Sequence, residues 1–185
     1  MTLRLENLPL SRDSVVIRSQ NLTQKRKVMA LCCHFFIYNQ GVESIKKTIE
    51  YNDSALALQI FDASGKPENK KALKEYYEKV SGVFLVFSLT DRSSFNSIKK
   101  WMDTLQKNLS KAIPIVLVGN KQDVGEKIVS PEDINQVVEE YKLKYFEVSA
   151  KENIRVSELF MSLITQGQSG KGTPRHQLSR QSNLQ

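Results

Sequence analysis

Short, uninterrupted apolar runs alternate along this chain with segments long enough to form helices. The run at 55–61 follows another extended segment, 45–51, across Asn52-Asp53, a two-residue turn sequence typical of a β-hairpin. The later runs suit parallel strands that are buried on both faces of a sheet. The predicted strands are 45–51, 55–61, 83–87, 115–118 and 145–148, and residues 15–17 are a candidate sixth.

Helix-length segments separate these strands. Ser130 followed by Pro131 is a good helix start. A Ser side chain can accept a hydrogen bond from an unpaired backbone N–H of the first turn, and Pro is tolerated at the first helical position. Strands alternating with helices predict an α/β fold: a doubly wound, mostly parallel six-stranded sheet with one antiparallel edge strand and helices on both faces. The predicted helices are 69–80, 93–108, 131–141 and 156–164, and residues 22–36 contain enough helix formers for a further one.

The length of 185 residues suits a single domain with short ends. We predict an irregular segment over 1–13, a domain over 14–165 and a disordered basic tail over 166–185, which is rich in Gly, Ser and Gln. No apolar run approaches the length of a membrane span, and two adjacent cysteines, Cys32 and Cys33, fit a reducing compartment. A cytoplasmic protein is therefore expected.

The net charge of +7 belongs to the two ends of the chain. Residues 41–164 carry as many acidic as basic side chains, and no basic stripe is interleaved with aromatic residues, so nucleic acid is not an expected partner. The basic ends are either solvated tails or a source of weak attraction to an anionic membrane surface. No C-terminal Cys is present to carry a prenyl group, so any membrane association is expected to be peripheral.

Two polar motifs follow the predicted strands at 115–118 and 145–148, where an α/β sheet binds its ligands. A carboxylate there can accept hydrogen bonds from the N1–H and the exocyclic amino group of guanine, which adenine does not offer. Backbone N–H groups of the second motif can bind the guanine O6. The alternative is two polar turns that cap helices. The motif residues are Asn120, Lys121 and Asp123 in the first and Ser149, Ala150 and Lys151 in the second.

A third motif follows the predicted strand at 55–61. Asp62 at a strand end can hold Mg²⁺ through water, and the backbone N–H of Gly65 can meet a terminal phosphate. Taken alone, this motif is only an acidic residue and a turn glycine. Together with the two guanine motifs, it predicts a nucleotide site with Asp62 on the metal side.

Residues 39–164 resemble the Ras-like small GTPases, and specifically their Rab branch. The stretch LQIFDASG at 58–65 resembles the Rab pattern LQIWDTAG, and EVSAK at 147–151 is similar to the family's ETSAK. The segment NQGVESIKKTI at 39–49 lines up with TIGVDFKxKTV. The resemblance implies a guanine-nucleotide binding module of the kind used in vesicle traffic and signalling, with GTP or GDP and Mg²⁺ as cofactors. It also implies effector and regulator proteins as partners, and we expect a monomer.

The phosphate-binding loop of that family does not appear in the sequence. No glycine precedes Gly41, so the pattern G-x-x-x-x-G-K-[ST], whose glycines let backbone N–H groups surround the phosphates, cannot form there. Counting back without gaps places this loop on Ser14–Asn21. Its Lys position is then Gln20 and its Ser/Thr position is Asn21.

Two further positions depart from the family. The Thr that senses Mg²⁺ and the terminal phosphate falls on Asn39, and the Gln that orients the attacking water falls on Lys66. We therefore expect weakened nucleotide binding with little or no GTP hydrolysis, and we assign no catalytic residue. The alternatives are a nucleotide-independent interaction scaffold, or a variant of an active GTPase whose phosphate loop is not represented in this sequence.

Overall fold

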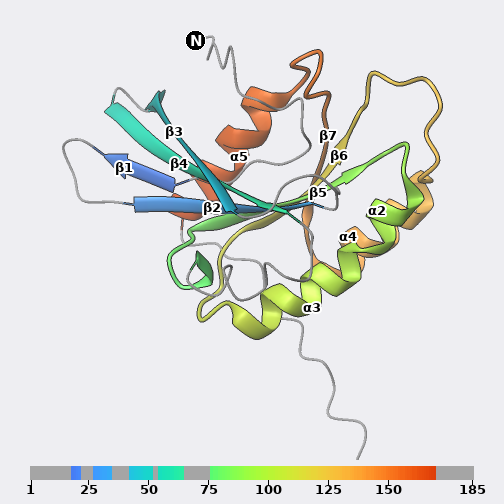
Figure 1. The fold of residues 1–185 in the computed structure, drawn as a ribbon, viewed down its shortest axis with the longest axis horizontal. Helices are drawn as coiled ribbons and strands as arrows, with labels where there is room; N and C mark the ends of the chain where they lie inside the picture. Colours follow the sequence, from blue (N-terminus) through green and yellow to red (C-terminus); the bar gives the residue numbers. More distant parts are fainter. Residues whose placement is uncertain (1–17, 22–26, 35–41, 52–53, 65–75, 170–185) are drawn as a thin grey trace, which may run out of the picture.

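The computed structural model describes residues 18–21, 27–34, 42–51, 54–64 and 76–169 (Figure 1). They form one seven-stranded sheet in the order β3-β4-β1-β2-β5-β6-β7, with a further pairing between β4 and β2. The α/β fold predicted from the sequence is confirmed, although the sheet has one strand more than the six expected. The strands are β1 (Arg18–Asn21), β2 (Lys27–His34), β3 (Val42–Tyr51), β4 (Ser54–Ser64), β5 (Gly82–Ser88), β6 (Ile115–Asn120) and β7 (Lys144–Glu147).

The five strands predicted with a clear apolar pattern all form. β3 and β4 pair antiparallel as far as Tyr51 and Ser54, on either side of the predicted turn, and β3 is the antiparallel edge strand. β2, β4, β5, β6 and β7 are parallel wherever they pair with one another. β5 and β6 are almost wholly buried, as expected for continuous apolar runs between neighbouring strands.

Helices cover both faces of the sheet (Figure 1). β5 contacts both layers: Phe84 packs edge-on against Phe160 of α5, while Phe87 packs against Phe95 of α2. The predicted helix at 93–108 divides at Ser97 into two, and the last helix extends to Gln168, into the predicted tail. The helices are α2 (Arg92–Asn96), α3 (Ile98–Asn108), α4 (Pro131–Tyr141) and α5 (Val156–Gln168).

The start of α4 confirms the sequence signal. Ser130 has an extended backbone, and its Oγ accepts a 3.2 Å hydrogen bond from the N–H of Asp133, with Pro131 as the first helical residue. The predicted helix at 69–80 lies largely outside the described residues, as do residues 1–17 and 170–185.

The N-terminal part differs from the sequence prediction. The helix predicted over Leu22–Phe36 is wrong, because residues 27–34 form β2, a strand parallel to both β4 and β5. Pairing on two sides supplies hydrogen bonds that override the modest helix propensity of Leu, Met and Ala. The ungapped count puts the family's phosphate loop on Ser14–Asn21, and in this segment Arg18–Asn21 form β1, a strand antiparallel to β2 and β4.

The strands that follow β2 in sequence lie on both sides of it in the sheet. β3 and β4 lie on one side, and β5, β6 and β7 lie on the other. Ligands of open α/β sheets bind beyond the carboxyl ends of the strands at such a switch point. The two guanine motifs follow β6 and β7, at this same edge of the sheet.

Candidate functional site

β6 and β7 bring the two guanine motifs together. The strands pair in parallel, with Val118 opposite Phe146 and Gly119 opposite Glu147, so both chains leave the sheet at the same edge. Backbone hydrogen bonds continue past the strands: the N–H of Val148 donates to Gly119, and that of Gln122 donates back to Val148. The loops are therefore joined before any side chain is considered.

Asn120 ties the two motifs at their base. Its Oδ1 accepts hydrogen bonds from the backbone N–H of Lys121 at 2.8 Å and from that of Ala150 at 3.0 Å. The side chain is buried, and the bond to Ala150 spans thirty positions of sequence. Asn120 consequently fixes where the N–H groups of the second motif lie relative to the first.

A hydrogen bond between Asp123 and Ser149 joins the loop after β6 to the loop after β7. The Oγ of Ser149, which is fully buried, donates a 2.5 Å hydrogen bond to Oδ1 of Asp123 and accepts one from the N–H of Glu152 at 3.0 Å. The bond from Ser149 lowers the pKa of Asp123, with help from the charges of Lys151 and Lys121. The carboxylate is thus held ionised, as an acceptor for two N–H groups needs to be.

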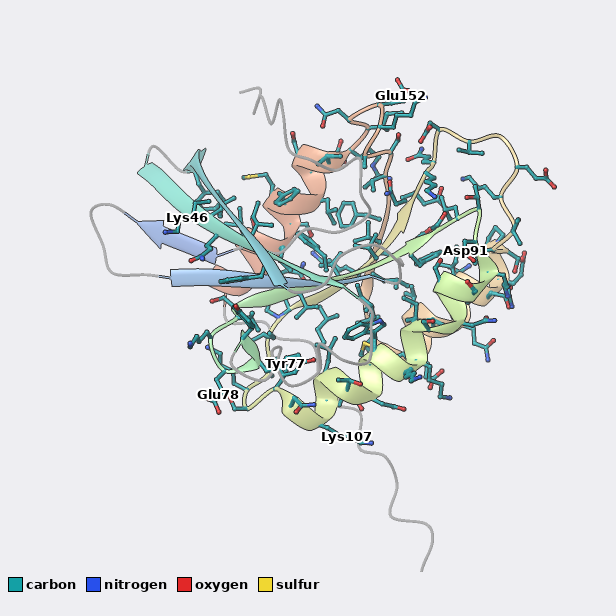
Figure 2. All side chains as sticks on the ribbon, viewed as in Figure 1. Lys46, Tyr77, Glu78, Asp91, Lys107 and Glu152 are labelled. Carbon is teal, nitrogen blue, oxygen red and sulfur yellow. The ribbon has the colours of Figure 1, made fainter. Side chains whose placement is uncertain are left out.

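The two lysines of the motifs flank this carboxylate. Lys121 adopts a left-handed backbone with φ of 69°, which turns the chain sharply after β6. Lys151 pairs with Glu152 at 3.0 Å, and this hydrogen bond raises its pKa. Glu152 lies at the tip of the second loop, away from the sheet (Figure 2). Lys151 therefore remains cationic at neutral pH, and the positive charges of both lysines act on the Asp123 carboxylate.

A supporting cluster beneath the loops was not predicted from the sequence. A side chain at Gly119 would meet the hydroxyl of Tyr145 at 2.6 Å. That hydroxyl donates to Oε1 of Glu147 at 3.1 Å, and Lys127 pairs with the other oxygen of Glu147 at 2.6 Å. Burial raises the pKa of Tyr145, so its hydroxyl stays protonated. The sequence signal available was Glu147 inside the EVSAK stretch. Its partner Tyr145 lies on the same strand, β7, whereas Lys127 comes from a separate loop.

For Asp62, the residue predicted to hold Mg²⁺, the structure gives the strand and the backbone pairing. Asp62 lies inside β4, opposite Glu43 of β3 and Cys32 of β2, and not at the strand end that the sequence predicted. The strand continues two residues further because β3 pairs along it as far as Ala63. Gly65, Asn39 and Lys66 lie outside the described residues. Among the described residues, no three His, Cys, Asp or Glu side chains gather as a metal site.

Few residues connect β2 to β3. β2 ends at His34 and β3 begins at Val42, so seven residues connect the switch-point strand to the next one. This connection is shorter than the eight-residue phosphate pattern alone, before any helix is added, and Gly41 is its one glycine. Gln20, which the ungapped count puts at the phosphate-binding Lys, lies in β1 opposite Lys27 and Ala57, at the amino ends of β2 and β4 and away from the edge where the base loops leave the sheet.

Comparison with known proteins supports the resemblance. A model of the Ras family matches residues 34–169. Ras-related protein RABE1d of Arabidopsis thaliana is 35% identical over 130 residues, which cover 69% of this chain and 60% of that protein. Ras-related protein Rab-13 of Rattus norvegicus is 32% identical over 129 residues, which cover 69% of this chain and 64% of that protein.

The chain spans about three fifths of the length of these curated relatives. In the part of the chain that the structure describes, no helix combines the length and apolarity needed to cross a bilayer. The sheet order, the helices on both faces and the two loops after β6 and β7 agree with the family match. The chain belongs to the Ras family of small GTPases, in its Rab branch.

Proposed function

We propose that this chain recognises guanine nucleotides through their base, binds them weakly and hydrolyses GTP little or not at all. The observation that carries the proposal is an asymmetry between the two halves of the site. Asp123 and Ser149 are hydrogen-bonded across the base loops, whereas only seven residues, 35–41, connect β2 to β3 where a phosphate loop and a helix would be needed.

The base half supports guanine over adenine. The ionised carboxylate of Asp123 suits the N1–H and the amino group of guanine, and adenine offers neither at that edge. The N–H of Ala150 donates to Asn120 Oδ1, so this donor has to be shared with or released to the guanine O6 when the base binds. One chain supplies all of these groups, so base binding requires no second copy and suits the monomer that we expect.

The phosphate half determines how weak the binding is. A hydrogen bond to a charged group contributes roughly 1.5–3 kcal/mol, and a phosphate loop supplies about four or five of them. Losing these bonds costs at least roughly 6 kcal/mol, which corresponds to an affinity about 10⁴-fold lower. We assign Asp62 to Mg²⁺, held through water, and Gly65 to a terminal phosphate, but weak phosphate binding leaves both with little to hold.

A second candidate is a nucleotide-independent interaction scaffold for effector or regulator proteins. The internal bonds of the base loops favour it, because Asn120 and Ser149 hold the two motifs together without a ligand. Its cellular site would be the cytoplasm or the surface of intracellular membranes. The Asp123→Asn variant separates the candidates: a scaffold keeps its partner in this variant, whereas a nucleotide-dependent partner is lost.

Base preference tests the first candidate. Displacement titrations with GDP, ADP and xanthosine diphosphate should rank GDP first for the wild type. Asp123→Asn should weaken GDP binding and favour xanthosine diphosphate, because an amide can donate to the oxygen at C2. Asp103→Asn on α3 is the matched control and should bind as the wild type does. Equal affinities of the wild type for GDP and ADP would contradict the proposal.

A further inference from the structure

The base loops and the switch-point strand β2 lie apart along the edge of the sheet. At the carboxyl edge the strands follow the order β4, β2, β5, β6 and β7, with β4 paired directly to β2 (Figure 1). Neighbouring strands are about 4.8 Å apart, so β2 lies roughly 10 Å from β6. The groups that meet a base on the loops after β6 and β7 are therefore separate from any groups that follow β2 or β4, where the phosphates of a nucleotide would lie.

The connection between β2 and β3 has to cross β4. His34, the last residue of β2, is opposite Ser64, whereas Val42, the first residue of β3, is opposite Ala63 on the other side of β4. Residues 35–41 therefore join points that are two strand spacings apart, or roughly 10 Å. Seven residues reach at most about 25 Å when fully extended. Too little chain remains for an eight-residue phosphate loop and the helix N-terminus that accompanies it.

The groups suited to the base all belong to the loops after β6 and β7. The carboxylate of Asp123 has about four acceptor positions, and the hydrogen bond from Ser149 uses one of them. The N1–H and the amino group of guanine can take two others. The N–H of Ala150, shared with Asn120, is the donor for the guanine O6. Each of these contacts involves the base alone, so a ligand without phosphates can make all of them.

The lysines of the base loops do not replace a phosphate loop. Lys151 pairs with Glu152 at 3.0 Å, and both side chains are at least half exposed. The charges of Lys121 and Lys151 also act on the Asp123 carboxylate. Their attraction for a phosphate is therefore offset by acids of the protein, and salt screens what is left.

Resting on the guanine recognition proposed above, we propose that the ligand class of this site is the guanine nucleoside, with or without phosphates. The site binds guanosine as tightly as GMP, GDP or GTP, and it does so without Mg²⁺. The 5′-phosphates add no net affinity, because the part of the chain that would hold them is too short to surround them.

The backbone N–H of Ala150 is a reporter of base binding. It donates to Asn120 Oδ1 at 3.0 Å, so a guanine O6 that shares this donor changes the NMR shift of the amide. The labelled full chain is titrated with guanosine, GMP and GDP, with and without Mg²⁺, in about 0.15 M and about 0.5 M salt. In the higher salt the dissociation constants of guanosine and GDP should agree within about threefold and should not respond to Mg²⁺. Four phosphate-loop hydrogen bonds would instead make GDP at least about 10⁴-fold tighter.

Nucleoside analogues test whether the base contacts are those described. Inosine, which lacks the amino group, should bind about tenfold more weakly than guanosine, since one hydrogen bond to a carboxylate is lost. Adenosine should leave the Ala150 amide unchanged. Asp123→Asn should favour xanthosine over guanosine. Asp103→Asn on α3 makes the same chemical change away from the loops, so this matched control should bind guanosine as the wild type does.

The outcomes separate this proposal from the proposed function. GDP that binds more than about tenfold tighter than guanosine in about 0.5 M salt, with guanine still preferred over adenine, would overturn the nucleoside proposal and leave guanine recognition standing. A requirement for Mg²⁺ would overturn it in the same way. Adenosine that binds as well as guanosine would contradict guanine recognition itself. No response to any guanine ligand would overturn both.

Discussion

The Oγ of Ser149 donates a 2.5 Å hydrogen bond to Asp123 Oδ1, joining residues 26 positions apart. This bond joins the loops that follow β6 and β7, and it also lowers the pKa of the carboxylate that is suited to guanine. The base half of a nucleotide site is thus held by the chain itself. We propose that this base half persists beside a weakened phosphate half.

Gly119→Ala should destabilise the protein by about 1–3 kcal/mol, because a Cβ there meets the Tyr145 hydroxyl at 2.6 Å and Leu89 at 3.0 Å. Urea unfolding gives the difference in free energy. Tyr145→Phe removes the nearer contact, so the double variant should recover part of the loss. A double variant with strictly additive losses would show that the Tyr145 hydroxyl is not the obstacle.

The pairing of α2 with α4 predicts an acid-dependent contribution to stability. The hydrogen bond from Arg92 lowers the pKa of Asp133 from its ordinary value of 3.8 to about 2, with a second bond from Ser130. The folded state therefore releases this proton more readily than the unfolded state, so the stabilisation is complete above about pH 4 and is lost as the pH falls through about 2.

Urea midpoints measured between pH 5 and pH 2 should fall less steeply for Asp133→Asn than for the wild type. Glu132→Gln, an exposed neighbour in the same first turn, is the matched control and should keep the wild-type slope. Identical slopes for the wild type and Asp133→Asn would mean that the pair with Arg92 does not persist in solution.

Several elements were predictable because their signals are local. Ser130 and Pro131 mark the start of α4, and Asn52-Asp53 marks the turn between β3 and β4. β2 was not predictable in this way, since its residues favour a helix and only pairing with β4 and β5 makes them a strand. Local propensity cannot report such distant partners.

The same distinction applies to the candidate site. The residue types at Asn120, Asp123, Ser149 and Ala150 suggested guanine chemistry, and the sheet register brings these residues together. The cluster of Tyr145, Glu147 and Lys127 could not be predicted, because Lys127 reaches Glu147 from a loop 20 positions earlier and no local pattern marks this contact.

Restoring the family residue at Lys66 should not restore hydrolysis. A Lys66→Gln variant regains the amide that can orient water. We still expect GTP turnover to stay at the rate measured in buffer alone, because we propose that the phosphates are bound weakly. Phosphate release over several hours, with a Lys66→Ala variant as the matched control, measures this. Turnover in Lys66→Gln alone would show that the chain does hold the terminal phosphate.

The nucleotide content of the purified protein tests the central claim most directly. The protein is denatured, its supernatant is separated by ion exchange, and the native protein is titrated with fluorescent GDP in Mg²⁺. We predict a protein free of nucleotide with weak, guanine-selective binding in the titration. Near-stoichiometric GDP in the supernatant would contradict the account, since it would require phosphate binding that the seven residues between β2 and β3 are not expected to provide.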